Sequence, residues 1–144
     1  MRCETLFVIA ALTFAPIASV ADSTPDAEPT YPDWQALADV GVIDIVTEDA
    51  DGDPRTTPIW FVLVDGDPYY RTSGSRWLEN LRRDPVHRVV IEDREYVARA
   101  DVVTDDTWIE RVDAASREKY GWQDRFIRFF RTAPPDLLRV APVD

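Results

Sequence analysis

The fold is decided by Tyr69-Tyr70-Arg71-Thr72-Ser73-Gly74-Ser75-Arg76-Trp77-Leu78-Glu79-Asn80-Leu81-Arg82-Arg83-Asp84-Pro85. Residues 69–72 read as a strand, Gly74 marks a tight turn, and a short helix follows that ends before Pro85. Ser73 or Ser75 can cap this helix, whose apolar face is Trp77, Leu78 and Leu81. The helix start leaves backbone N–H groups unpaired at its positive end, beside two hydroxyl groups and Arg76. Such a corner suits an organic phosphate.

The charge of the chain supports an anionic ligand at this corner. The net charge is −11, yet arginines crowd into this one region: Arg71, Arg76, Arg82, Arg83 and Arg88. Local positive charge in an acidic chain favours an anion site; the alternative is a strand-to-helix corner with solvated arginines. The acidic balance argues against a nucleic-acid partner.

The same stretch resembles a known superfamily. Tyr70, Thr72 and Gly74-Ser75-Arg76, followed by Asn80-Leu81 and Asp84-Pro85, are similar to the flavin-binding split-barrel proteins. These include pyridoxamine 5′-phosphate oxidases and deazaflavin-dependent nitroreductase-like proteins. Trp77-x-x-Asn80-Leu81 and Tyr96-x-Ala98-x-Ala100-x-Val102-Val103 look more like the second branch. The likeness covers residues 40–142 and implies a mainly β fold, a six-stranded antiparallel split β-barrel with peripheral helices.

Residues 1–21 have the features of a secretory signal peptide. Residues 6–20 are almost wholly apolar, and Ser19-Val20-Ala21 has the small-x-small pattern of a cleavage site. The run is short for a membrane span. We therefore expect cleavage after Ala21, a periplasmic or secreted protein, and no stable membrane insertion. An uncleaved anchor is the alternative, because Glu4 weakens the positive start.

The rest of the chain divides into a tether and one domain. Residues 22–32 are rich in Pro, Asp and Thr, which predicts disorder, and residues 33–144 are expected to fold around a single core. The only cysteine, Cys3, leaves with the leader, so we expect no disulfide and no thiolate metal site. The run Asp49-x-Asp51-x-Asp53 lacks the closing Glu of a calcium loop, and an Asp-Gly hairpin turn explains it. We expect no metal.

Hydrophobic patterning predicts the elements of the domain. Asp33 caps a short helix through Ala38, and strands are expected at residues 42–47, 55–64, 69–72, 86–91, 96–103 and 137–142. The second strand is apolar at every position from Ile59 to Val64, so both of its faces should be covered, one by the barrel interior and the other by a helix or a second subunit. On this ground we expect a homodimer.

The helices near the C-terminus carry most of the remaining aromatic residues. A long helix is predicted from a cap at Thr104 or Asp105 to Tyr120, with Gly121 as its stop. A second helix is expected to follow. We interpret the aromatic group as core or subunit interface, with a ligand wall as the alternative; it comprises Trp108, Tyr120, Trp122, Phe126, Phe129 and Phe130.

The resemblance implies where a cofactor binds. Split-barrel proteins hold the flavin with the second strand and with the turn after the third. Carried onto this chain, the ligand residues are Arg55, Thr57, Pro58, Ile59, Thr72, Ser73, Ser75 and Arg76. We expect the phosphate at the Thr72–Arg76 turn, with added charge from Arg55, and the ring along residues 57–59, where amides beside Pro58 bond the ring edge. The oxidase branch has a phosphate-binding Lys where this chain has Trp77, and its Arg-x-His element is absent, so oxidation of pyridoxamine phosphate is not expected.

Three classes of function remain. In an exported oxidoreductase, nitroreductase- or quinone reductase-like, FMN or a deazaflavin supplies the hydride chemistry that reduces a small organic acceptor. Such an enzyme needs no reactive Cys or His, and His87, the only histidine, is expected to be packed or solvated. The alternative is a non-catalytic binding protein for a flavin, haem or other planar ligand, and a third is a barrel with no cofactor that serves as an interaction domain.

Overall fold

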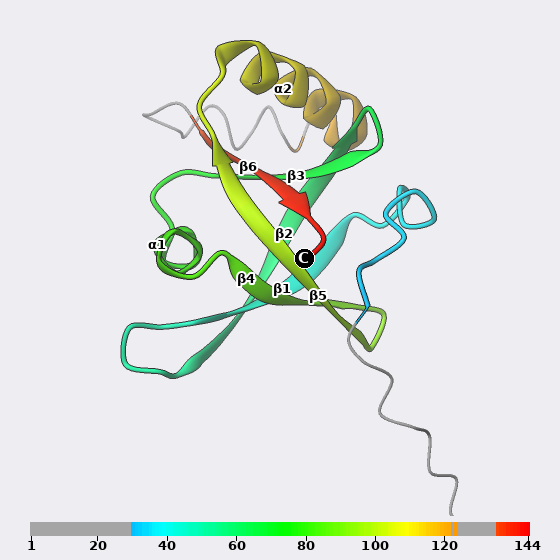
Figure 1. Ribbon diagram of the computed structural model, residues 1–144. Helices are drawn as coiled ribbons and strands as arrows, with labels where there is room; N and C mark the ends of the chain where they lie inside the picture. The colour runs from blue at the N-terminus through cyan, green and yellow to red at the C-terminus, as the bar shows by residue number, and fades with distance from the viewer. Residues whose placement is uncertain (1–29, 122, 124–134) are drawn as a thin grey trace, which may run out of the picture.

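The computed structural model describes residues 30–121, 123 and 135–144. Its elements follow one another as β1 (Val42–Glu48), β2 (Pro54–Val64), β3 (Asp67–Thr72), α1 (Arg76–Arg83), β4 (Val86–Ile91), β5 (Arg94–Val103), α2 (Asp106–Tyr120) and β6 (Asp136–Ala141). The six strands close into a barrel in the order β1-β2-β3-β6-β5-β4, and every neighbouring pair is antiparallel. Figure 1 shows this barrel with α1 at one side and α2 lying across one end. The predicted six-stranded antiparallel barrel is confirmed.

Side chains that alternate along the strands fill the barrel interior. Ile43 and Ile45 of β1, Tyr70 of β3 and Leu138 of β6 are each at most 2% exposed and belong to one cluster. The apolar face of α1 adds Trp77, Leu78 and Leu81 to this cluster, as predicted. Helix α1 therefore lies at the side of the barrel and turns its apolar face toward the interior side chains.

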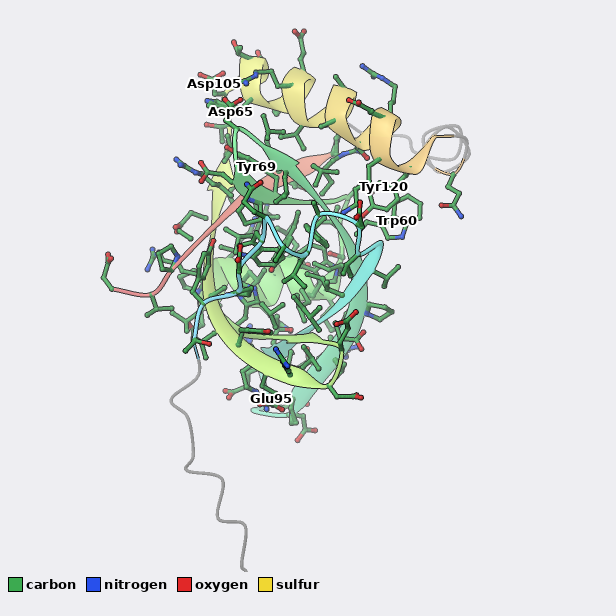
Figure 2. The ribbon with its side chains drawn as sticks, turned by 90° about the vertical axis from the view of Figure 1, so that its right-hand side faces the viewer. Trp60, Asp65, Tyr69, Glu95, Asp105 and Tyr120 are labelled. Atoms are coloured by element: carbon green, nitrogen blue, oxygen red, sulfur yellow. The ribbon has the colours of Figure 1, made fainter. Side chains whose placement is uncertain are left out.

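A second apolar layer lies between the outer face of β2 and helix α2. Val62 and Val64 point outward from β2 and pack with Val112 and Tyr120 of α2. Figure 2 shows Tyr69, Trp60 and Tyr120 at this boundary, with Glu95 far away at the other end of the barrel. Helix α2 thus covers the second face of β2, so the apolar pattern of this strand does not require a second subunit. The homodimer stays a prediction.

The ends of α2 follow the sequence signals. The Asp105 carboxylate accepts hydrogen bonds from the N–H groups of Thr107 and Trp108, and Gly121 ends the helix with a positive φ of 55°. The helix predicted for residues 33–38 is wrong, because this segment forms turns. Asp33 does accept a bond from the Ala36 N–H, as a cap would, and Trp34 is buried against Phe61.

Several predictions concern residues outside the described part. The predicted signal peptide, most of the predicted tether and the aromatic residues of the predicted second helix (Trp122, Phe126, Phe129 and Phe130) fall in residues 1–29, 122 and 124–134. Among the residues that the structure describes, no helix has the length and apolar character needed to cross a membrane.

Candidate functional site

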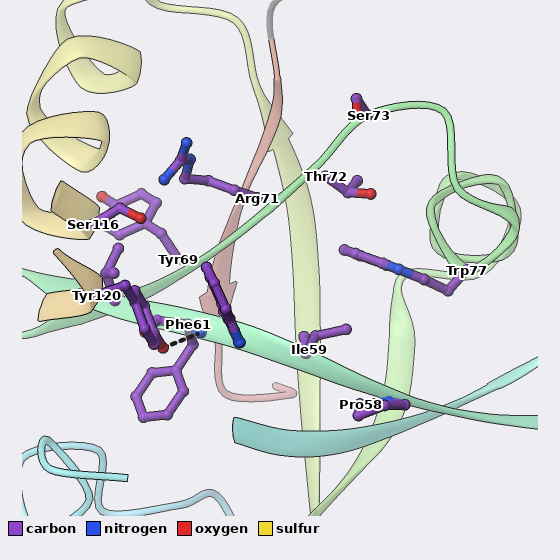
Figure 3. A pocket seen from close by; sticks show the side chains of 12 residues that line it. Pro58, Ile59, Phe61, Tyr69, Arg71, Thr72, Ser73, Trp77, Ser116 and Tyr120 are labelled. Atoms are coloured by element: carbon purple, nitrogen blue, oxygen red, sulfur yellow. Dashed lines mark hydrogen bonds between the residues drawn. The ribbon is translucent and has the colours of Figure 1, made fainter. Parts of the chain in front are cut away.

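A half-open cavity of about 300 Å³ lies between β2, β3, the start of α1 and the second half of α2. Figure 3 shows Arg71 reaching from β3 toward α2 on one side, with Ser73 and Trp77 on the other. One part of the wall is aromatic and the opposite part carries hydroxyl groups and a guanidinium. The lining residues are Pro58, Ile59, Trp60, Phe61, Val62, Tyr69, Arg71, Thr72, Ser73, Trp77, Ser116 and Tyr120.

The cavity forms because β2 loses its partner on one side. Strand β1 pairs with β2 from Trp60 down to Pro54, whereas β3 pairs with β2 only from Phe61 onward. Within the described part of the chain, no strand covers the edge of residues 58–60 that faces away from β1. Pro58 belongs at such a place, since it has no N–H to offer to a ladder.

The directions of the backbone amides correct one expectation. The N–H and C=O of Phe61 point toward the β1 side, where both bond the Tyr120 hydroxyl. Because amide directions alternate along a strand, the N–H groups of Ile59 and Thr57 point toward β1 as well. The amides beside Pro58 thus serve the β1–β2 ladder, and we expect a ring at this edge to meet the Pro58 carbonyl instead.

The Tyr120 hydroxyl extends the β1–β2 ladder by one step. It lies between Phe61 and Gly41, which stand just beyond the last β1–β2 pair, Val42 and Trp60. The hydroxyl donates to the Gly41 carbonyl at 2.7 Å, and the Phe61 N–H donates to the hydroxyl at 3.2 Å. Burial raises the pKa of Tyr120 to about 12, so the hydroxyl keeps its proton. The Tyr120 ring stacks on Trp60 with 4.4 Å between centroids, and this stack forms the aromatic wall.

Lys119 fixes the same end of α2. Its ammonium lies 3.7 Å above the Phe61 ring and donates to the Phe61 carbonyl at 3.2 Å. Burial lowers the pKa of Lys119 to about 8. The end of α2 is therefore tied to β2 by two adjacent residues.

Only some residues of the predicted phosphate corner line the cavity. Thr72 and Ser73 line the cavity. Ser75 is the N-cap residue of α1 by position, but its hydroxyl accepts a bond from the Thr72 hydroxyl at 2.8 Å and makes no side-chain cap. The expectation that Ser75 caps the helix through its side chain is wrong. The hydroxyl pair instead ties the end of β3 to the start of α1.

Arg55 and Arg76 lie on the outer side of this turn and not in the cavity. The Asp49 carboxylate accepts two bonds from the Arg55 Nε and a third from Nη2, at 2.6–3.0 Å. The Asn80 amide bonds the same carboxylate at 2.7 Å, and Arg76 comes within 3.9 Å of it. These contacts, the Arg55 bonds first, lower the pKa of Asp49. Arg55 is thus committed to Asp49, whereas the Arg76 side chain is 68% exposed and can turn to a ligand.

The arginine that lines the cavity is Arg71, which the sequence analysis counted among the clustered arginines but did not assign as a ligand residue. Its side chain is 10% exposed, and its Nε lies 3.1 Å from a carboxylate oxygen of Asp113 on α2. The alternation of β3 is the signal that could have found it. Tyr70 points into the barrel, so Arg71 must point out, toward the helix that the apolar stripe of residues 108–120 predicts.

His87 lies away from the cavity, packed as expected. It is 3% exposed, its Nδ1 donates to the Pro85 carbonyl at 3.2 Å, and its Nε2 accepts from the Tyr70 hydroxyl at 3.2 Å. Burial lowers the pKa of His87 to about 4. Its two nitrogens are therefore both engaged, and the imidazole is neutral at physiological pH.

Comparison with known proteins gives matches by structure alone. No protein-family model matches the sequence, and no curated protein matches it. Rv2991, a conserved hypothetical protein from Mycobacterium tuberculosis, superposes with a TM-score of 0.63 at 20% identity over 84% of this chain and 87% of that one. The haem storage protein HutZ from Vibrio cholerae gives 0.61 at 22% over 81% and 92%. The F420-H2 dependent reductase FDR-A gives 0.55 at 17% over 71% and 95%.

The chain has the split-barrel fold. At these identities the likeness concerns the fold and not the ligand. Whether a planar, phosphate-bearing cofactor suits this split barrel therefore depends on the residues of the cavity. Its volume is at the small end of ligand sites, enough for a ring system. The aromatic wall and the uncovered edge of β2 fit a flat ring, and the hydroxyl groups of Thr72 and Ser73 fit an oxyanion. The cavity lining thus fits a flat ring well, and binding of a phosphate depends on Arg76 in addition.

Proposed function

We propose that the protein is an exported flavin- or deazaflavin-binding oxidoreductase, nitroreductase- or quinone reductase-like, that reduces a small organic acceptor. The observation that carries this proposal is the cavity between the uncovered edge of β2 and the Thr72–Ser75 turn. It places an aromatic wall beside hydroxyl groups and the start of a helix. FMN or a deazaflavin would supply the hydride chemistry, and the protein would supply binding and orientation.

Different residues of the cavity would bind the ring and the phosphate of the cofactor. Trp60, Tyr120 and Trp77 provide flat apolar surface for a ring, and the Pro58 carbonyl can accept from an N–H at the ring edge. Thr72 and Ser73 can donate to phosphate oxygens, with the first-turn N–H groups of α1 beside them. Arg76 is exposed, so it can swing onto the phosphate without leaving a buried carboxylate unpaired.

The second candidate is a non-catalytic binding protein for haem or another planar ligand. The structural match to a haem storage protein favours it. The placement of His87 works against a histidine-ligated haem, because the only histidine of the chain is engaged by Tyr70 and Pro85 outside the cavity. A haem held here would need a different axial ligand.

Titration of the mature protein with FMN, a reduced deazaflavin and haem tests the proposal. We expect FMN or the deazaflavin to bind below about 0.1 mM, which corresponds to a binding free energy of about −5.5 kcal/mol. Riboflavin, which lacks the phosphate, should bind more weakly than FMN. If neither FMN nor the deazaflavin binds below this concentration, the cofactor assignment fails. A haem-only result, with a Soret band, would select the second candidate.

Two substitutions at the outer side of the turn should act in opposite directions. Arg76→Ala should weaken FMN binding, since it strips a charged partner from the phosphate, by about 1.5–3 kcal/mol. Asp49→Asn removes the negative charge that lies 3.9 Å from Arg76 and should strengthen FMN binding by about 5-fold or less. Equal FMN affinity in native protein and Arg76→Ala would place the phosphate elsewhere.

A further inference from the structure

We propose that the indole N–H of Trp77 is a specificity-determining donor of the cavity. It selects planar aromatic ligands that offer a ring nitrogen or a ring carbonyl oxygen to the α1 side of the cavity. Trp77 would then read the edge of the ligand as well as cover its face. Naming the ligand as a flavin rests on the proposed function. The preference for an acceptor at this position does not.

The start of α1 fixes where the Trp77 ring lies. Trp77 is the second residue of α1 and is 6% exposed. Its ring makes a T-shaped contact with Tyr70 in the barrel interior, with 6.4 Å between centroids and 81° between the planes. Figure 3 shows the same ring reaching from α1 into the cavity. The interior cluster therefore holds the ring in place, and the ring presents its remaining edge to a ligand.

The Trp77 indole N–H has no hydrogen-bond partner within the described part of the chain. In that part, Trp34 Nε1 is fully enclosed and unbonded, whereas Trp77 Nε1 is not enclosed. Trp77 is almost wholly buried and lines the cavity, so the cavity is the side from which solvent reaches this nitrogen. A ligand in the cavity can therefore accept the hydrogen bond.

The opposite wall of the cavity favours a flat ligand. Trp60 and Tyr120 stack with 10° between their planes and lie toward α2, whereas Trp77 comes from α1. Nitrogen and carbonyl acceptors of an aromatic ring direct their lone pairs in the plane of the ring. A ring that lies on the Trp60 wall can therefore offer these lone pairs to a donor at its edge.

A bound ring makes this donor selective because it displaces water. The free N–H can bond water, and an indole nitrogen is a donor only. A ring nitrogen or carbonyl restores the hydrogen bond, whereas a C–H or N–H edge leaves the Trp77 donor unpaired in a nearly buried residue. An unpaired buried donor costs more than a typical hydrogen bond gains. The site therefore discriminates mainly by rejecting rings without an acceptor at this position.

Quinoline and indole test the donor on the native protein. Both are bicyclic rings of similar size, but quinoline carries an unprotonated ring nitrogen at neutral pH, whereas indole carries only an N–H. We expect quinoline to bind more tightly than indole by about 5-fold or more. The chain has five tryptophans, and in an NMR titration the indole proton of Trp77 should move downfield with quinoline and not with indole. Equal affinities would overturn the proposal without any variant.

The variant Trp77→Phe locates the preference. It keeps an aromatic ring against Tyr70 and removes the N–H, so we expect quinoline to lose about 5-fold or more in affinity relative to indole. The control is Trp60→Phe, which shortens the other tryptophan of the cavity. Trp60 is more exposed and contributes stacking surface, so its loss should weaken both compounds by the same factor.

Two results of this comparison would overturn the proposal. One is a preference for quinoline that survives in Trp77→Phe, and the other is a preference that disappears in Trp60→Phe. Circular dichroism shows whether each variant folds. If Trp77→Phe does not fold, the titration of the native protein decides alone.

FMN and 5-deaza-FMN identify the acceptor, and this comparison rests on the proposed function. The two differ at one ring position, where FMN has a nitrogen and the analogue a C–H. If Trp77 bonds this nitrogen, the native protein prefers FMN and Trp77→Phe loses the preference. If Trp77 bonds a ring carbonyl, both cofactors bind equally and both weaken in Trp77→Phe. Equal FMN affinity in native protein and Trp77→Phe would overturn the role of Trp77 toward the cofactor. A preference for quinoline with no binding of either cofactor would leave the donor assignment standing and would end the proposed flavin function.

Discussion

The barrel interior and the layer beneath α2 are built from opposite faces of the same strands, but the interior is closed to solvent whereas the layer contains an open cavity. Adjacent residues of β3 show the contrast. Tyr70 is sealed in the interior, where its hydroxyl bonds the His87 imidazole, whereas Arg71 lines a cavity that opens to solvent. A single strand thus supplies stability with one face and a candidate site with the other. Substitutions on the interior face should therefore change mainly the stability, and substitutions on the outer face mainly ligand binding.

Loss of an interior side chain should have the largest effect. Leu138 is fully buried in the barrel interior, so Leu138→Ala should lower the free energy of unfolding by about 2–5 kcal/mol. Ile109 is only partly buried in the layer under α2, and Ile109→Ala should lower it by less than half as much. Urea unfolding of both variants measures the difference. Equal losses would mean that the α2 layer is packed as tightly as the interior.

Protonation of His87 should destabilise the interior and not the α2 layer. Burial lowers the pKa of His87 to about 4, from 6.5 in the unfolded chain. Between these values the unfolded state binds more protons than the native state, so the free energy of unfolding falls as pH falls from 6.5 to 4. The full loss attributable to His87 is about 3 kcal/mol.

The measurement compares native protein with His87→Gln across this window. Because the carboxylates titrate in both proteins, the difference between the two stability curves isolates His87. We expect the native protein to lose its stability advantage as pH falls. Parallel curves would show that His87 does not titrate with a lowered pKa.

Patterning along the chain was enough to predict the strands and the antiparallel hairpins, and the family resemblance implied their closure into a barrel. Each strand alternates or is apolar on both faces, and short turns such as Asp65-Gly66 force neighbouring strands to be antiparallel. The end of α1 before Pro85 and the stop of α2 at Gly121 follow from the restrictions on proline and the freedom of glycine. These signals are local, so they survive in a single sequence. The segment at residues 33–38 failed because its few helical residues could not offset the cost of helix nucleation.

The site was predicted less completely because it depends on distant contacts. Thr72, Ser73, Pro58 and Ile59 do meet at one cavity, since β2 and β3 are neighbours in the sequence. Tyr120, however, reaches Phe61 from 59 positions away, and nothing local to either residue indicates that contact. Arg55 was assigned by family likeness, and its bonds to Asp49 depend on the conformation of the β1–β2 turn. Charge alone could not show which arginine faces the cavity.

The smallest effect should come from the hydroxyl that joins the two regions. The Tyr120 hydroxyl bonds Phe61 and Gly41, so Tyr120→Phe leaves the Phe61 N–H and the Gly41 carbonyl without this partner. We expect a loss of about 1–3 kcal/mol in the free energy of unfolding and faster hydrogen exchange at the Phe61 amide. Tyr31→Phe is the matched control, because its hydroxyl donates to the Val140 carbonyl at a partly buried position, and it should lose only about 0.5–1.5 kcal/mol. The phenyl ring of Tyr120→Phe can still stack on Trp60, so FMN binding should change by less than about 2-fold, well under 1 kcal/mol. If FMN binding falls together with stability, the Tyr120 hydroxyl contacts the ligand, and Tyr120 belongs to the binding face as well as to the structural face.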